Sequence, residues 1–215
     1  MYASSMNRRT IAGVLAAALV PACGLLAQGQ PAPTMSSGST SPPSSATRAA
    51  LPAGTSASDW TIPGHDFGGT RYSELDKIDT NNVSKLKEAW SYTTGIKDGH
   101  EGQPLVVDGR MYVVTPYPDK LIAFDLSKPG PAKLWEYAPP VDPQSFGRAC
   151  CDDVNRGASY FDGKIFYNVL DNQTVAVDAK TGKEVWRTRL APADKGSTMT
   201  MAPLVVKGKV YVGNS

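Results

Sequence analysis

Three segments of the chain share one pattern of hydrophobic and polar positions. Each has two short apolar runs separated by two turn residues, which are Asp-Gly in the first two segments and Lys-Gly in the third. An Asp-Gly pair between apolar runs is a strong short-range signal for a β-hairpin. The pattern therefore predicts hairpins over residues 105–113, 159–167 and 204–212.

A second pair of strands is predicted after each of the first two hairpins. An apolar run at residues 121–125 leads through a polar turn to Trp135, and a fuller version at 174–178 leads to Trp186. The units recur about every 50 residues, and four antiparallel strands make one blade of a β-propeller. We therefore predict an all-β chain, a partial β-propeller. Trp186 is expected to lie flat between neighbouring blades.

The expected extent is about two complete blades plus parts of two others. One partial blade ends at Trp90, after the run 86–89, and the other is the hairpin at 204–212. A propeller closes by repeating blades around an axis, typically about four to eight of them. We therefore expect the chain to be the N-terminal fragment of a longer protein.

The N-terminal region indicates export. Residues 1–27 read as a signal peptide, with Arg8-Arg9 before the apolar run 11–20, which is short for a transmembrane helix. Processing either follows Ala27 or precedes Cys23, and in the second case Cys23 is lipidated and anchors the protein. Both readings predict a periplasmic location for the folded part.

Composition divides the rest of the chain in two. Residues 28–58 are rich in Pro, Ser, Ala and Gly and predict a disordered tether, whereas residues 59–215 carry the predicted strands. The formal net charge is +2, and charges of both signs are scattered along the chain. This balance argues against binding to nucleic acid. It leaves the oligomeric state open.

Two of the three cysteines, Cys150 and Cys151, are adjacent. A disulfide between neighbours closes almost no loop, so it restricts the unfolded chain very little, and its geometry is unfavourable. The pair therefore favours a rigid, flat apolar surface or a redox element, with two buried thiols as the plainer alternative. Export favours a bond between the two sulfur atoms, because disulfides persist outside the cytoplasm.

With these features assembled, the chain resembles the quinoprotein alcohol dehydrogenases of the methanol/ethanol type, which depend on pyrroloquinoline quinone (PQQ). The lanthanide-type methanol dehydrogenases look closest. Members of this family are eight-bladed propellers. The likeness runs from about residue 60 to residue 215 and is most specific at residues 150–157. The other segments that carry it are 70–73, 82–86 with a short capped helix, 100–107, 197–203 and 213–215.

The resemblance implies six cofactor-binding residues: Glu101, Cys150, Cys151, Arg156, Thr200 and Ser215. The two cysteines match a disulfide ring that stacks on one face of the planar cofactor. Arg156 matches an arginine that holds a PQQ carboxylate, for which a guanidinium fork is well suited. Glu101 matches a carboxylate that hydrogen-bonds the cofactor, and the two hydroxyl residues match donors to its carboxylate oxygens.

The resemblance also implies a reaction, the oxidation of a small primary alcohol to an aldehyde with electrons passing to a c-type cytochrome. A calcium or lanthanide ion would act as Lewis acid, and an aspartate would act as general base. The residues for these two roles belong beyond Ser215, so we expect this chain alone to be inactive. The alternative function is a non-catalytic, lipid-anchored propeller scaffold of the outer-membrane assembly type, which suits a lipidated Cys23 but needs no cysteine pair.

Overall fold

The computed structural model describes residues 51, 56, 58–149 and 152–214, all within one compact unit that spans residues 43–215. The predicted signal peptide, most of the tether, and Cys23, Cys150, Cys151 and Ser215 lie outside the described residues. Within the described part, no helix is long and apolar enough to cross a membrane.

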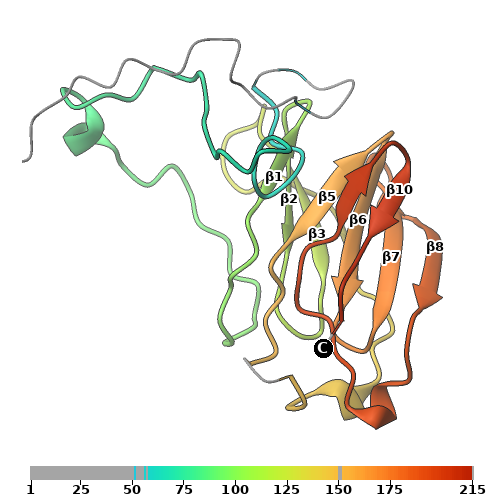
Figure 1. The fold of residues 1–215 in the computed structure, drawn as a ribbon. Helices are drawn as coiled ribbons and strands as arrows, with labels where there is room; N and C mark the ends of the chain where they lie inside the picture. The colour runs from blue at the N-terminus through green and yellow to red at the C-terminus, as the bar shows by residue number, and fades with distance from the viewer. Residues whose placement is uncertain (1–50, 52–55, 57, 150–151, 215) are drawn as a thin grey trace, which may run out of the picture. The chain divides into compact units, whose positions relative to one another are not determined.

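The described chain forms two four-stranded antiparallel sheets and one hairpin (Figure 1). Strands follow one another in chain order within each sheet, which is the arrangement of a propeller blade. Blade one consists of β1 (Leu105–Val107), β2 (Arg110–Val114), β3 (Leu121–Asp125) and β4 (Lys133–Tyr137). Blade two consists of β5 (Ala158–Phe161), β6 (Lys164–Val169), β7 (Gln173–Asp178) and β8 (Glu184–Arg189). The third sheet pairs β9 (Leu204–Val206) with β10 (Lys209–Tyr211).

All three predicted hairpins are confirmed. Both central residues of each turn have positive φ, between 48° and 72°, as a type I′ turn requires. This turn matches the right-handed twist of the flanking strands, so it sets the register of each pair. The turn pairs are Asp108-Gly109, Asp162-Gly163 and Lys207-Gly208.

The two blades repeat the same irregularity. The pairing of the third strand with the fourth shifts register between Ala123 and Phe124 in blade one, and between Ala176 and Val177 in blade two. The innermost strands of successive sheets are neighbours, with β1 beside β5 and β5 beside β9. The prediction of two complete blades is therefore confirmed, and the hairpin of β9 and β10 is one of the two predicted partial blades.

The main hydrophobic core lies between the two blades. Alternate residues of β6 face opposite ways, so that Ile165 and Tyr167 pack against blade one while Phe166 packs toward Val205 of the third sheet. The Tyr112 hydroxyl crosses this interface and donates to the carbonyl of Ala179 at 3.1 Å. The buried apolar residues of the main core are Leu105, Val107, Tyr112, Val114, Leu121, Ala123, Ala158, Ile165, Tyr167, Val169, Val175, Val177 and Ala179.

A tryptophan and a glycine form a close contact between the blades. Trp135 of β4 lies against Gly182, which sits in the turn before β8 with φ at 73°. A Cβ atom built on Gly182 would lie 2.6 Å from the Trp135 ring, so only glycine fits beneath it. Trp186 has the corresponding position in blade two. Its ring packs on Phe166 with ring centroids 5.9 Å apart, and it borders a cavity also lined by Val210. Both rings thus lie on the side of their own blade that faces the next sheet.

Two local predictions before blade one are corrected. Residues 86–90 form no strand, because no described segment pairs with them; Trp90 instead packs on Phe124 with ring centroids 5.7 Å apart. The predicted helix is a single 3₁₀ turn, η2 (Val83–Lys85), and Asn82 does not cap it with its side chain. The Asp79 side chain instead accepts hydrogen bonds from the backbone NH groups of residues 81 and 82, in the turn that precedes η2.

Candidate cofactor site

Three of the predicted cofactor-binding residues lie together at the junction of the blades. The Arg156 Nε lies 3.2 Å from a carboxylate oxygen of Glu101. The Arg156 Nη1 donates to the Thr200 hydroxyl at 2.6 Å, and the Arg156 backbone NH donates to the Thr200 carbonyl at 2.9 Å. Arg156 therefore pairs with these two residues, and not with Asp152 or Asp153 nearby in sequence.

Two glycines allow Glu101 to reach Arg156. The segment before β1 crosses the segment before β5, where Gln103 and Gly157 form an isolated parallel bridge. A Cβ atom on Gly102 would lie 3.0 Å from the Asn155 carbonyl oxygen, and one on Gly157 would lie 3.2 Å from the Gln103 carbonyl oxygen. Since larger residues would separate the two segments, the glycines set the distance between the Glu101 and Arg156 side chains.

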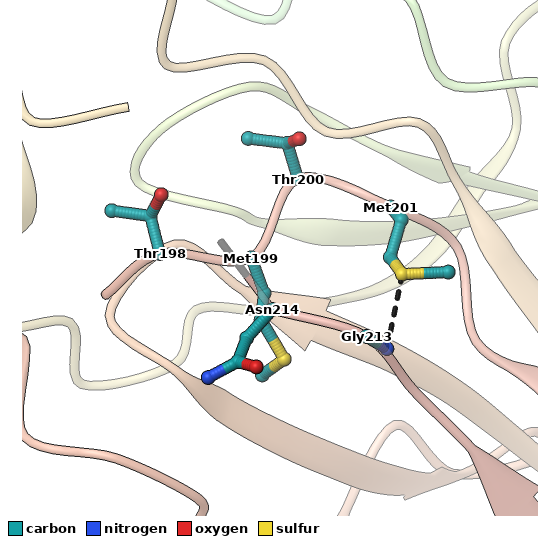
Figure 2. Close-up of a pocket in the computed structure, with 6 residues that line it drawn as sticks. All are labelled: Thr198, Met199, Thr200, Met201, Gly213 and Asn214. Atoms are coloured by element: carbon teal, nitrogen blue, oxygen red, sulfur yellow. Dashed lines mark hydrogen bonds between the residues drawn. The ribbon is translucent and has the colours of Figure 1, made fainter. Parts of the chain in front are cut away.

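Thr200 lines a cavity of about 230 Å³ between the segment that precedes β9 and the segment that follows β10. Figure 2 shows residues 198–201 on one segment, facing Gly213 and Asn214 on the segment that follows β10. The Gly213 NH donates to the Met201 sulfur at 3.1 Å, which ties the two segments together. Asn214 directly precedes the predicted site residue Ser215, so the described end of the chain lies beside Thr200.

The chain on either side of the predicted cysteine pair is held by one buried carboxylate. The Gly147 NH donates to both oxygens of Asp153, at 3.0 and 3.2 Å, and Asp153 is buried. The Asp153 carbonyl accepts a hydrogen bond from the Tyr117 NH of blade one. These contacts join Gly147 to Asp153, and they join Asp153 to the turn that follows β2 in blade one.

A network of buried side chains lies behind Arg156. Asn155, 1% exposed, donates through Nδ2 to the Asp119 carboxylate at 2.9 Å and to the Asn168 carbonyl at 2.8 Å. The Asn168 side chain in turn donates to the Met201 carbonyl at 2.9 Å. Asp119 is 1% exposed, and its other oxygen accepts the Leu170 NH at 2.9 Å.

Burial raises the pKa of Asp119 to about 7, because a charged carboxylate is disfavoured away from water. Hydrogen bonds from Asn155 and Leu170 act in the opposite direction, and the nearby acids Asp171 and Asp153 add to the increase. Sequence reasoning missed Asp119, because Pro118-Asp119 reads as an ordinary turn and nothing local marks the carboxylate as buried. Asn155 was part of the recognised motif but had no role assigned.

The contacts of Arg156 with Glu101 and Thr200 are better suited to binding an anionic ligand than to stabilising the fold. Arg156 and Glu101 have side chains 43% and 49% exposed, and an ion pair this accessible contributes little to folding. A guanidinium bonded to a hydroxyl residue that lines a cavity is well placed to bind a carboxylate. The residues present thus fit a cofactor that carries carboxylates, such as PQQ. Within the described ranges, no three acidic, His or Cys side chains are grouped so as to hold a metal ion.

Fold and site together define a partial propeller with Glu101, Arg156 and Thr200 clustered at the junction of its two described blades. Residues 60–215 match the family described as the β-propeller domain of PQQ-type glucose/ethanol/alcohol dehydrogenases. The chain is 51% identical over 156 residues to the lanthanide-dependent methanol dehydrogenase of Methylacidiphilum fumariolicum (strain SolV), covering 73% of this chain and 26% of that protein. It is 45% identical to methanol dehydrogenase (cytochrome c) subunit 1 of Methylobacterium organophilum, with the same two coverages.

A solved structure gives the same result. The chain superposes on a europium-containing methanol dehydrogenase with a TM-score of 0.72 and 49% identity, covering 74% of this chain and 28% of that one. The chain therefore belongs to the PQQ-dependent alcohol dehydrogenase family. It spans about a quarter of the length of the relatives that it matches.

Proposed function

We propose that this chain is the N-terminal part of a PQQ-dependent dehydrogenase that oxidises a small primary alcohol, of the methanol or ethanol type. Its relatives include dehydrogenases of methanol and of 1-butanol. The observation that carries the proposal is the cluster of Glu101, Arg156 and Thr200, in which Arg156 follows Cys151 by five residues in the sequence. A non-catalytic scaffold has no need for this cluster.

The chain's own residues bind and orient the cofactor in this proposal. Arg156 and Thr200 donate to a cofactor carboxylate, and Glu101 holds the guanidinium in place while accepting from a cofactor donor. A disulfide between Cys150 and Cys151 forms a flat wall against one face of the ring system, with Ser215 as a further donor. When bound, PQQ supplies the quinone that takes up hydride from the alcohol.

The metal ligands and the electron acceptor lie outside this chain in the proposal. A calcium or lanthanide ion held by residues beyond Ser215 would polarise the quinone, and a partner c-type cytochrome would accept the electrons. Relatives named for a lanthanide and for cytochrome c support this choice. We further propose export to the periplasm, by a signal over residues 1–27, with lipidation of Cys23 as one route to a membrane anchor.

Arg156→Gln in the full-length protein tests the function. The variant keeps a polar side chain but is shorter and loses the charged fork, so we expect PQQ to bind about 10- to 100-fold more weakly, with a matching loss of alcohol-dependent cytochrome reduction. Titration of apo protein with PQQ, in calcium or lanthanum, measures the affinity. The matched control is Arg187→Gln, which removes another arginine beside a glutamate, on β8 away from the cluster.

Two results would contradict the proposal. One is the absence of PQQ-dependent oxidation of any primary alcohol by the wild-type protein in either metal. The other is equal PQQ affinity in the Arg156 variant and its control. Alkylation and mass spectrometry of the native protein test the cysteine wall separately, because a disulfide protects both sulfur atoms whereas free thiols are labelled.

A further inference from the structure

The side chain of Asn155 brackets the backbone of Arg156. Its Nδ2 group is held by Asp119 and by the Asn168 carbonyl, and its Oδ1 accepts the Gly157 NH at 3.1 Å. Residues 155 and 157 are thus both tied to one buried amide. The position of Arg156 relative to blade one depends on what holds this amide.

Asp119 is the only side chain bonded to the Asn155 amide nitrogen in the described part of the chain. It comes from the turn between β2 and β3, while Asn155 precedes β5, so the bond joins the two blades. The turn is itself braced, because Thr115 accepts the Lys120 NH at 3.0 Å and the Asp119 NH donates to the Pro116 carbonyl. The Asp119 carboxylate is therefore a fixed point on blade one.

We propose that Asp119 is a positioning residue that holds Arg156 in place for the cofactor carboxylate, acting through Asn155. The inference rests on the proposed function. Glu101 approaches Arg156 from the blade-one side, whereas Thr200 approaches it from the segment before β9. A displaced Asn155 moves the guanidinium relative to both partners, so the fork no longer meets the carboxylate in the geometry that a bidentate contact needs.

The test is the affinity of the full-length apo protein for PQQ in a double-mutant cycle. Asp119→Ala removes both accepting oxygens, and we expect PQQ to bind about 10-fold more weakly, as for other residues that orient a ligand-binding group. In the Arg156→Gln background the same change should have almost no further effect, because the group being positioned is gone. A purely structural role would weaken binding equally in both backgrounds.

The matched control is Asp162→Ala. Asp162 also lies in a turn with positive φ, at 48° against 59° for Asp119, but it is exposed and bonds only to Lys164 of its own turn among the interactions described. We expect its PQQ affinity to equal that of wild type. If Asp119→Ala does not fold, Asp119→Asn takes its place in the cycle, because it keeps the size and one accepting oxygen, and its expected effect is smaller but equally dependent on Arg156.

These measurements distinguish failure of the proposed function from failure of the positioning role of Asp119. No PQQ binding by the wild-type protein overturns the proposed function. Normal wild-type binding with additive effects of the two substitutions, or with unchanged affinity in a folded Asp119 variant, overturns the positioning role alone. Loss of affinity that depends on Arg156 supports it.

Discussion

Single residues decide how closely the blades approach each other. Gly182 combines two restrictions, a left-handed backbone and the Trp135 ring directly over its Cα. Gly163 has almost the same φ, 72° against 73°, but a Cβ atom there would meet nothing within 4 Å. The two glycines therefore separate the effect of backbone strain from that of the contact between blades.

We predict that Gly182→Ala lowers the free energy of unfolding of this chain by about 3 kcal/mol or more, because it adds a steric clash to a strained backbone. Gly163→Ala should lower it by only about 1–2 kcal/mol, through the backbone alone. Urea denaturation monitored by tryptophan fluorescence measures both. Equal losses in the two variants would show that the Trp135 contact does not constrain position 182.

At the scale of elements, the three hairpins share one turn geometry but not one turn sequence. Lys207 adopts a φ of 50° at the position where the other two hairpins have aspartate. Asparagine and aspartate tolerate this region much better than lysine does, because their short side chains bond locally. The third hairpin therefore has a turn residue less suited to its conformation.

We predict that Lys207→Asn stabilises the chain by about 0.5–1 kcal/mol. Lys209→Asn, two residues later within β10, is the control, and it should give no gain because asparagine is unfavourable in a strand. The midpoint of urea denaturation reports both changes. A gain in the control as large as that at position 207 would point to the loss of a surface charge instead of the turn.

Asp119, in the turn between β2 and β3, should make the stability of the chain depend on pH. The pKa of Asp119 is about 7 in the folded chain and near 3.8 when unfolded, so the folded state binds one more proton between these values. The resulting stabilisation is complete below about pH 4 and is lost as the pH rises through 7. From this group, unfolding free energy should fall by roughly 1 kcal/mol per pH unit between pH 5 and pH 7.

Asp119→Asn isolates this contribution, because asparagine does not titrate. Urea denaturation at pH 5, 6, 7 and 8 should show a smaller decline in the variant than in the wild-type chain. The same decline in both would mean that Asp119 is ionised throughout this range, with its hydrogen bonds from Asn155 and Leu170 outweighing its burial.

At the scale of the whole molecule, the proposed cofactor cluster is open to solvent in the described part of the chain. The side chains of Arg156 and Glu101 remain close to half exposed, at 43% and 49%. All six residues of β8 are exposed, as expected for a blade edge that an adjacent element would cover. These features fit a chain that matches about a quarter of its relatives' length.

We therefore predict that the 215-residue chain alone binds PQQ with a Kd weaker than about 1 μM and does not oxidise alcohols. One exposed arginine and a hydroxyl cannot supply the affinity of an enclosed site. Isothermal titration of the refolded chain with PQQ, in calcium or lanthanum, measures the Kd. Submicromolar binding would show that the residues of this chain suffice for the cofactor site.

The sequence by itself determined the hairpins and the repeated blade, and through a resemblance it indicated the family. Hairpins are specified by neighbouring residues, since two turn positions and the alternation beside them set the register. Only the tertiary structure decided which distant groups meet. The bond from Asn155 to Asp119 spans 36 residues and that from Arg156 to Thr200 spans 44. Such contacts depend on how the blades pack, and no local pattern encodes that packing.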